Sequence, residues 1–256
     1  MSIETILNTA LKLGAGLMEN GAETFRAEDT IERICHSMGC ENIQVFAIPT
    51  GIFLSVYYQN EMHTRFHRVH SSTINLRIVT RLNDLSRKIV ASGLSNGDID
   101  NELNFILASP SYAPKIRSLF AGLAGGFFTL MFQGTILEFL FAFTVSAIVK
   151  LLYIYMMSAI QSGFLKNIFG GFATAILAIG LAAMGETILP TSYDTIIIGA
   201  IMPLVPGVSM TNAIRDSLSG ELVSGIAKLA ETLIVATGIA IGVGVALSLR
   251  INIIGG

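Results

Sequence analysis

The chain has 256 residues, of which 13% are charged and 52% are hydrophobic, and its formal net charge is −2 at pH 7. The charges are unevenly divided, because residues 1–114 hold 9 of the 16 Lys and Arg and 12 of the 18 Asp and Glu. Between Ser118 and Ile214 the charged residues are Glu138, Lys150, Lys166, Glu186 and Asp194. This composition excludes an ordinary soluble domain there, because such a domain needs a charged surface. The sequence contains no basic run that would indicate a nucleic-acid partner.

Two domains are predicted from this division, an α+β domain over residues 1–114 and an all-α transmembrane domain over residues 115–256. The first residues, MSIETILNTA, lack the basic residues and the following apolar core of a secretory signal, so we expect the α+β domain to stay in the cytoplasm. Cys35 and Cys40 would then lie in a reducing compartment, and their spacing matches neither CxxC nor a metal-ligand pattern. We expect two free, partly buried thiols.

The cytoplasmic domain begins with two helices that meet near Asn20-Gly21, a helix-stop signal. About three strands follow in IQVFAIPTGIFLSVYYQNEMHTRFHRV, with turns at residues 49–51 and 59–60, and then a helix over about 74–91. Polar and apolar residues alternate in the third strand. We expect one polar face, with Glu61, His63, Arg65 and His67, and one face that packs inward, with Met62, Thr64 and Phe66.

Two groups in this domain are candidates for chemistry. His63, Arg65 and His67 form either a metal or anion site or a solvated strand face, and Arg65 favours the solvated face because it would repel a cation. Glu23, Arg26 and Glu28 form either an acid/base group or helix-surface ion pairs. No catalytic triad, nucleophile elbow, P-loop or zinc signature occurs, so no cofactor and no metal are predicted.

The second domain is predicted to cross the membrane about five times, because a bilayer core of about 30 Å requires about 20 apolar helical residues. The predicted spans cover about 118–135, 136–156, 168–187, 194–219 and 227–249. Lys and Arg in the short loops place the N-terminus in the cytoplasm and the C-terminus outside the cell, in a multi-pass inner (plasma) membrane protein. GxxxG pairs at Gly122 and Gly126, and at Gly238 and Gly242, predict close helix packing.

The fourth span is interrupted by Pro206 and Gly207. One alternative is that a helix ends there at the cytoplasmic face. The other is that two half-helices meet there and line a cavity, because unwound backbone within a membrane must be buried in protein or line a water-filled cavity. In the second case the half-helices run from about Asp194 to Val205 and from Gly207 or Ser209 to about Leu218. The second half-helix would aim free N–H groups at a substrate carboxylate, with Ser209, Thr211 and Asn212 as further contacts.

Charged residues near or inside the spans are further candidates. Glu138 either binds a proton or pairs with a cation of a partner subunit. Alternatively, it is an exposed carboxylate at the outer interface. Lys150 either attracts an anionic substrate or counters a carboxylate, or its side chain extends to the cytoplasmic interface, which is the favoured interpretation. Arg215 and Asp216 are either an intracellular gate pair or ordinary interfacial charges.

Four segments together resemble the threonine/serine exporter (ThrE) family, and most closely the larger, YjjP-like subunit of its split form. They are GAETFRAEDTIERICHSMG, VFAIPTGIFLSV, HTRFHRV and PLVPGVSMTNAIRDSLSGELVSGIAKLAE, and the resemblance extends from about Leu13 to Leu247. It implies a cytoplasmic N-terminal domain, about five transmembrane helices, and secondary export of threonine and serine or of a dicarboxylate such as succinate. Because the sequence stops at Gly256, the resemblance also implies a separate small YjjB-like membrane partner.

Three functions remain open, and a higher oligomer is compatible with each. The first is a subunit of a secondary exporter, which is not an enzyme. The second is a membrane-tethered enzyme that uses the cytoplasmic residues Glu23, Arg26, Glu28, His63 and His67. The third is a ligand sensor that signals through the spans. The interrupted helix and the charges within the spans favour the exporter.

Overall fold

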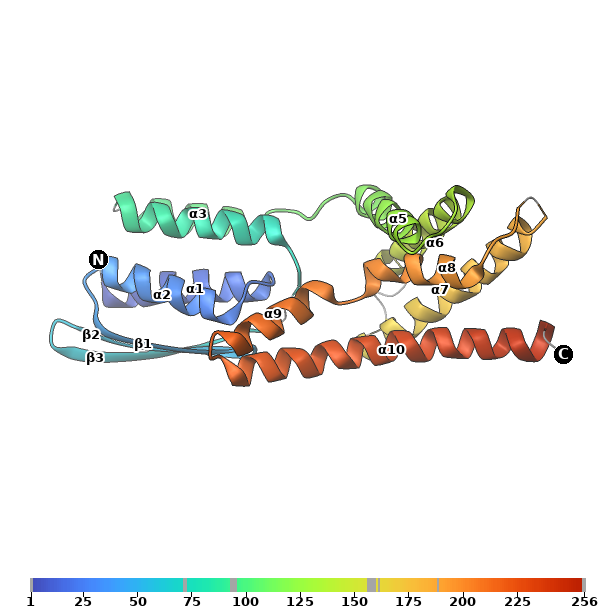
Figure 1. The fold of residues 1–256 in the computed structure, drawn as a ribbon. Helices are drawn as coiled ribbons and strands as arrows, with labels where there is room; N and C mark the ends of the chain where they lie inside the picture. The colour runs from blue at the N-terminus through green and yellow to red at the C-terminus, as the bar shows by residue number, and fades with distance from the viewer. Residues whose placement is uncertain are drawn as a thin grey trace. The chain divides into compact units, whose positions relative to one another are not determined.

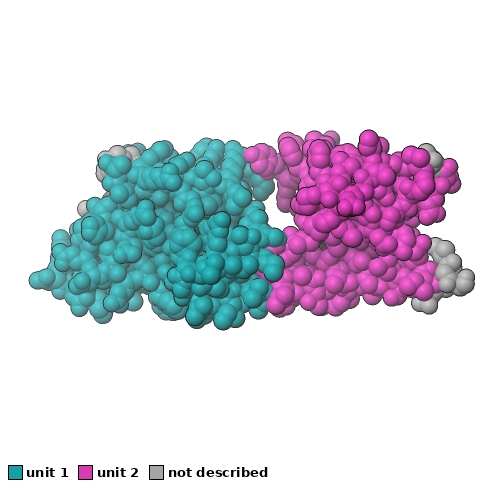
Figure 2. Space-filling view, in the orientation of Figure 1, with its two compact units in different colours: residues 1–111, 207–230 teal, residues 112–206, 231–256 magenta. Residues whose placement is uncertain are grey.

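A computed structural model of the chain describes residues 2–70, 73–92, 96–155, 160, 162–187 and 189–254. Packing divides the chain into two compact units (Figure 2). Unit 1 comprises Met1–Ser111 and Gly207–Ala230, and unit 2 comprises Tyr112–Pro206 and Glu231–Gly256. The predicted end of the second span, residue 156, lies outside the described residues.

Unit 1 combines helices with a small sheet (Figure 1). Its elements, in chain order, are α1 (Ile3–Glu19), α2 (Thr24–Ser37), β1 (Glu41–Ile48), β2 (Gly51–Tyr58), β3 (Glu61–Arg68), α3 (Leu76–Ser92), α4 (Asn96–Leu107), α9 (Gly207–Leu218) and the first turns of α10 (Leu222–Ile254).

The strands form one antiparallel sheet in the order β1-β2-β3, which confirms the predicted three-stranded sheet. The turn between β2 and β3 consists of Gln59 and Asn60, whose φ angles are 52° and 65°. Two positive φ angles are the conformation of a type I′ hairpin turn, whose twist matches that of the strands. This turn sets the β2–β3 register, in which Tyr58 lies opposite Glu61 and Phe53 opposite Phe66.

Helices α1 and α2 cover one face of the sheet (Figure 1). Ile52, Leu54 and Val56 of β2 point toward these helices and are completely buried. The residues between them in the sequence point to the opposite face, where Phe53 and Phe66 are 45% and 52% exposed and their rings lie 4.7 Å apart. The core of unit 1 therefore lies between the sheet and its helices.

The predicted orientation of the third strand was wrong. Met62 and Phe66 are on the exposed face, whereas His63 and His67 lie opposite the core residues Val56 and Ile52. Alternation defines two faces of a strand but does not say which one is covered. The packing of α1 and α2 decides which face of β2 is covered, and the hairpin register then places His63 and His67 on that same face. At the sheet edge the polar face of β3 reaches α1, where Arg65 pairs with Glu4 at 2.6 Å.

The link between α1 and α2 follows the predicted stop signal. Helix α1 ends at Glu19, Asn20 occupies the C-cap position, and Gly21 has a φ of 89°. Glycine adopts this left-handed conformation without a steric penalty, so the chain can reverse here. Helix α2 then buries one face, with Ala27, Ile31, Ile34 and Cys35 inside.

Among its described residues, unit 2 consists of helices joined by turns and contains no strand. It contains α5 (Pro114–Met131), α6 (Ile136–Tyr155), α7 (Gly163–Gly185), α8 (Tyr193–Ile201), the 3₁₀ turn η2 (Met202–Leu204) and the rest of α10.

Small residues lie where these helices approach most closely. A Cβ on Gly122 or Gly126 of α5 would press against Phe143 or Phe139 of α6, at 2.9 and 2.7 Å. A Cβ on Gly242 of α10 would overlap backbone atoms of α7. Both GxxxG pairs therefore form contacts within the chain, as expected for helices that pack without bulky side chains between them.

Three of the described helices are long and apolar enough to cross a membrane: α6, α7 and α10. A fourth span results if the bent pair Tyr193–Leu204 and Gly207–Leu218 is counted as one. Helix α5, the first predicted span, is not among the helices that are long and apolar enough. The count of five spans therefore stays a prediction.

The helix that begins at Tyr193 is interrupted at the predicted position. It tightens into η2, Val205 is extended with a ψ of 130°, and a new helix begins at Gly207. Pro206 explains the interruption, because proline donates no backbone hydrogen bond and forces the preceding residue out of the helical conformation. Helix α9 starts at Gly207, one of the two predicted starting points.

Packing and hydropathy divide the chain differently. Residues 207–230 fall within the predicted membrane domain, yet they pack with the N-terminal residues in unit 1. The buried residues of α9 are Asn212, Ala213 and Asp216, two of them polar. This contact brings together two parts of the chain that are about 190 residues apart in sequence.

Candidate functional site

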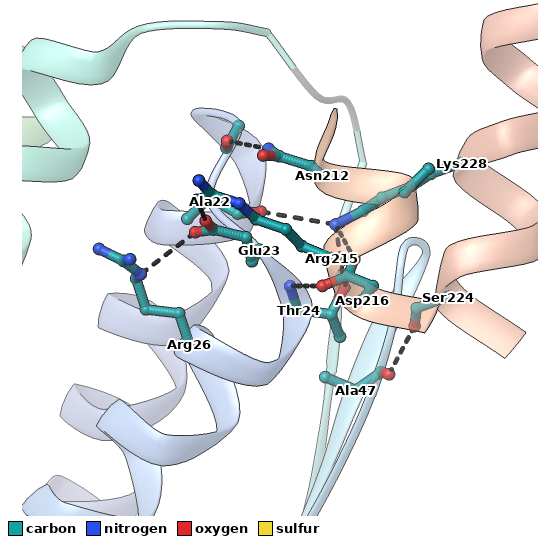
Figure 3. Close-up of polar contacts among 12 residues, drawn as sticks. Ala22, Glu23, Thr24, Arg26, Ala47, Asn212, Arg215, Asp216, Ser224 and Lys228 are labelled. Atoms are coloured by element: carbon teal, nitrogen blue, oxygen red, sulfur yellow. Dashed lines mark hydrogen bonds and ion pairs between the residues drawn. The ribbon is translucent and has the colours of Figure 1, made fainter. Parts of the chain in front are cut away.

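Asp216 of α9 lies at the centre of a buried polar network in unit 1 (Figure 3). The side chain is completely buried, and one carboxylate oxygen lies 2.7 Å from Nζ of Lys228 on α10. The backbone N–H of Thr24 donates to the other oxygen at 2.9 Å, and the Thr24 hydroxyl donates at 3.1 Å to the oxygen that Lys228 binds. Asp216 therefore caps the first turn of α2, where the helix dipole favours a negative charge.

A second set of contacts lies beside it and is more exposed. Glu23 accepts a hydrogen bond from Arg215 at 2.8 Å and pairs with Arg26 at 3.1 Å (Figure 3). The amide of Asn212 donates to the carbonyl of Gly21 at 2.8 Å. Glu23 and Arg26 thus join Asn212 and Arg215 in one site, although the sequence analysis had placed them in separate domains.

The carboxylate of Glu23 stays ionised because of its neighbours. Burial raises the pKa of this group, but a backbone hydrogen bond, the hydrogen bond from Arg215 and the charges of Arg26 and Arg215 outweigh that effect. The net pKa of Glu23 is below its ordinary value. A charged Glu23 holds two guanidinium groups at one edge of the site, and each still has further N–H donors.

Local sequence explains how α9 and α10 reach this position. Gly220, with a φ of 97°, allows the tight turn between them, in which the N–H of Glu221 donates to the carbonyl of Asp216 at 2.9 Å. Gly225 then lets α10 pack against α9, because a Cβ there would lie 2.9 Å from the Ala213 carbonyl oxygen. The turn places Lys228 opposite Asp216.

A groove of about 660 Å³ adjoins the network, and all of its walls belong to unit 1. Three walls form it: the α1–α2 link, one side of α3 and the first turns of α9. The lining residues are Gly21, Ala22, Glu23, Arg26, Leu76, Val79, Thr80, Asn83, Gly207, Val208, Thr211, Asn212 and Arg215.

The groove offers an environment suited to a small anion. Arg26 and Arg215 supply two positive charges and Glu23 supplies one negative charge, so the charge on the walls is net positive, and Thr80, Asn83 and Thr211 supply polar groups. The first turn of α9 lines it as well, and the first N–H groups of a helix have no partner within the helix. Thr211 donates its hydroxyl to the Gly207 carbonyl at 3.0 Å. Ser209 and Pro206 do not line the groove.

Arg215 and Asp216 are not paired with each other in the structure. Arg215 binds Glu23, and Asp216 binds Lys228 and Thr24. Sequence reasoning missed Thr24 and Lys228. The available signal for Lys228 is its position 12 residues after Asp216, with the helix-ending Gly220 between them.

Glu138 has a role that neither interpretation of the sequence included. Its side chain is buried and accepts hydrogen bonds from the N–H groups of Thr135 and Ser192, at 2.7 and 2.6 Å. Thr135 and Glu138 form a capping box at the start of α6, and the bond to Ser192 ties α6 to the start of α8. The spacing T-x-x-E in the sequence was the available signal.

The remaining candidates lie elsewhere. Lys150 is half-buried on α6 and forms no ion pair among the described residues. His63 lies 3.9 Å from Glu61 on β3, and Arg65 binds Glu4. Within the described part of the chain, no group of three His, Cys, Asp or Glu side chains is arranged to hold a metal ion. Glu28 accepts a hydrogen bond from the N–H of Ala47 at 2.6 Å.

Comparison with known proteins identifies the family to which the chain is similar. Residues 8–250 match the family described as "Putative threonine/serine exporter" (ThrE). The chain is 24% identical over 256 residues to the "Threonine/serine exporter" of Corynebacterium glutamicum, and the match covers 95% of this chain but 51% of that protein. The chain therefore spans about half the length of that relative.

Two further relatives are of similar length to this chain. Both carry the name "Probable succinate transporter subunit YjjP". The Klebsiella aerogenes protein is 24% identical over 239 residues, covering 91% of this chain and 89% of the relative. The Escherichia coli K12 protein is 22% identical over 250 residues, covering 95% and 94%. No solved structure matches the chain.

Proposed function

We propose, from the premise that the chain belongs to the threonine/serine exporter family, that it is one subunit of a secondary exporter for a small metabolite with a carboxylate group. The family and the apolar helices make it a membrane protein of the exporter class. The candidates for the substrate are threonine, serine and a dicarboxylate such as succinate, from the names of the relatives. In this proposal the chain is not an enzyme.

The groove between α3 and α9 is the proposed substrate site on the cytoplasmic side. The observation that carries this is the meeting of Arg26 and Arg215 with the first turn of α9 in one groove of about 660 Å³. Guanidinium groups and helix N-termini both bind carboxylates well. In broken-helix transporters, substrate carboxylates are held at such half-helix starts.

We further propose that a small membrane subunit completes the exporter. The two YjjP relatives are named as subunits, and the Corynebacterium relative is about twice as long as the matched segment. The proposed topology has five spans, with α5 as the first, the N-terminus in the cytoplasm and the C-terminus outside.

Flux measurements test this function. The chain is reconstituted in vesicles with and without its small partner, the vesicles are loaded with labelled threonine, serine or succinate, and efflux is followed. Efflux of at least one compound is expected only when both subunits are present. If none of the three leaves the vesicles with both subunits present, the exporter proposal is wrong.

A variant that fills the groove tests the proposed site. Val208 lines the groove at α9 and has no part in the polar network, so Val208→Trp should block the groove while leaving Asp216 and Glu23 in place. We expect efflux to fall by more than about tenfold with normal membrane insertion. The control is Val223→Trp, an exposed position on α10 outside the groove. Equal efflux from the two variants would remove the groove from the transport path.

A further inference from the structure

The sheet of unit 1 has a second face, which the described helices of that unit leave uncovered. Its large apolar side chains are between 42% and 63% exposed: Phe46, Phe53, Tyr57, Met62 and Phe66. Phe46 lies opposite Phe53, and Phe53 lies opposite Phe66, so three phenyl rings form one row across the strands. Tyr57 and Met62 form a second pair toward the other end of the sheet. We call these five residues the aromatic face.

The rings of this row are packed against one another and against the backbone. The ring centroids of Phe46 and Phe53 lie 6.5 Å apart, and those of Phe53 and Phe66 lie 4.7 Å apart, distances at which aromatic rings attract. A Cβ on Gly51 would lie 2.6 Å from the ring of Phe66, so this ring lies directly over the glycine. The aromatic face is therefore preformed, and little side-chain freedom is lost when it binds another surface.

The aromatic face is large for a surface that remains in water. An aromatic side chain has an accessible area of about 200 Å², so five large side chains that are about half exposed leave about 500 Å² of mostly apolar surface. Contiguous apolar patches of this size on a protein surface often mark interaction sites. Two such faces packed together bury about 1,000 Å², which is the area that a specific interface needs.

Opposite charges lie at two corners of the same face. Glu41 of β1 lies opposite Tyr57, and Arg68 of β3 lies opposite Gly51, so the two charges are diagonally opposite across the sheet. Both side chains are exposed, and neither forms an ion pair among the described residues. The outward positions between them carry no charge. The face is therefore apolar at its centre, with one positive and one negative corner.

This arrangement is complementary to itself. The point halfway between Glu41 and Arg68 falls on β2, between Phe53 and Ser55. A two-fold axis through this point, parallel to the face and perpendicular to the line joining the two charges, lays Glu41 of each copy over Arg68 of the other. A two-fold interface uses the same patch on both copies, so this contact occurs twice. A membrane surface fits less well, because it would place Glu41 against anionic lipid headgroups.

We propose that two copies of the chain associate through the aromatic face, with Glu41 of each copy paired with Arg68 of the other. The substrate groove is lined by the α1–α2 link, α3 and α9 and by no residue of the strands, so it stays open in the pair. The proposal does not depend on which metabolite is carried, and its tests need no transport measurement.

Cross-linking of the full-length chain in lipid vesicles tests the interface. Ser55 lies next to the proposed axis, so the thiols of Ser55→Cys on two copies should approach each other. Packed sheets lie about 10 Å apart, and a bismaleimide of about that length should join most of the chains in pairs. The native Cys35 and Cys40 are buried and should not react. The matched control is Ser37→Cys, an exposed position on α2, which should give only background cross-linking.

An exchange of charges separates this interface from contacts between the spans. Glu41→Arg brings two arginines together at each corner, and Arg68→Glu brings two glutamates together. Each single variant should therefore raise the dissociation constant of the pair by about tenfold. The double variant, Glu41→Arg with Arg68→Glu, restores both ion pairs with reversed polarity and should associate like the natural chain. Energy transfer between copies that carry donor and acceptor dyes measures the dissociation constants in vesicles, and circular dichroism checks the fold of each variant.

Two results would overturn the proposal. One is cross-linking of Ser55→Cys no stronger than that of Ser37→Cys, in which case lipid or a different protein covers the aromatic face. The other is a double variant that associates as weakly as the single variants, or single variants that associate as tightly as the natural chain, because Glu41 would then not meet Arg68 of a second copy.

Discussion

At the scale of single residues, the pair Asp216–Lys228 combines a fully buried carboxylate with an ammonium group whose side chain is 17% exposed. Charges removed from water to this extent are costly unless paired and hydrogen-bonded. Asp216 meets this requirement with Lys228 and with two hydrogen bonds from Thr24. The pair joins α2, α9 and α10, so it fixes these elements relative to one another within unit 1.

Removing one member of the pair should therefore be severe. We expect Asp216→Ala to lower the free energy of unfolding of unit 1 by about 3–5 kcal/mol, because Lys228 and the Thr24 N–H lose a buried partner. Denaturant unfolding of the purified chain, followed by circular dichroism, measures the loss. The control is Asp29→Ala, which removes an exposed pair with Arg33 on α2 and should cost less than about 1 kcal/mol. Equal losses would show that Asp216 has no special role.

At the scale of elements, the glycines of α10 separate packing from helix propensity. Gly242 lies against the backbone of α7, whereas a Cβ on Gly244 would meet nothing within 4 Å. Both glycines belong to the same helix and to the same hydrophobic segment. The difference between them comes only from the neighbouring helix.

These two positions provide a matched test of the α7–α10 contact. We expect Gly242→Ala to destabilise the chain by about 1–3 kcal/mol, because the methyl group pushes the helices apart. Gly244→Ala should be neutral or stabilise the chain by up to about 1 kcal/mol, because alanine favours the helix. Thermal unfolding in detergent measures both. A stabilising Gly242→Ala would mean that α7 and α10 do not pack at this glycine.

The elements also show where local sequence was sufficient. Asn20-Gly21 ends α1 at its C-terminus, Gln59-Asn60 forms the β2–β3 turn, and Pro206-Gly207 sets the start of α9. Each feature is determined by the backbone preferences of two residues. The covered face of β3 was not determined in this way. Both faces of the sheet carry apolar side chains, so only the position of α1 and α2 decides which side is buried.

At the scale of the whole molecule, packing constrains the topology. Residues 207–230 pack with the N-terminal residues in unit 1, so we expect both to lie on the same side of the membrane. In the proposed topology this is the cytoplasmic side. The end of α7 should then lie on the opposite side, because 23 helical residues span about 35 Å and the bilayer core is about 30 Å thick.

Accessibility of single cysteines tests this topology. The native thiols should not react with the label. Cys35 and Cys40 are buried, and burial raises the pKa of both thiols, for Cys35 to about 12. We expect a membrane-impermeant maleimide to label Ser219→Cys in inside-out vesicles. Met184→Cys, at the exposed end of α7, should be labelled in right-side-out vesicles. Labelling of both from the same side would contradict the proposed topology.

The sequence by itself determined the features that depend on neighbouring residues and on overall composition. These are the charge-poor half of the chain, the apolar helices, the antiparallel hairpins and the interruption at Pro206-Gly207. The candidate residues Glu23, Arg26, Asn212, Arg215 and Asp216 were also identified, though in two separate groups. Composition and local backbone preference act over a few residues, so they can be read without knowing the path of the chain.

Only the tertiary structure decided how these residues meet. It brought the α9–α10 segment onto α2, paired Asp216 with Lys228 and Thr24, and placed Arg26 and Arg215 on one groove. It also placed Glu138 in a capping box bonded to the start of α8. The physical reason is that contacts between residues as many as 206 positions apart depend on the packing of whole elements, which no local pattern specifies.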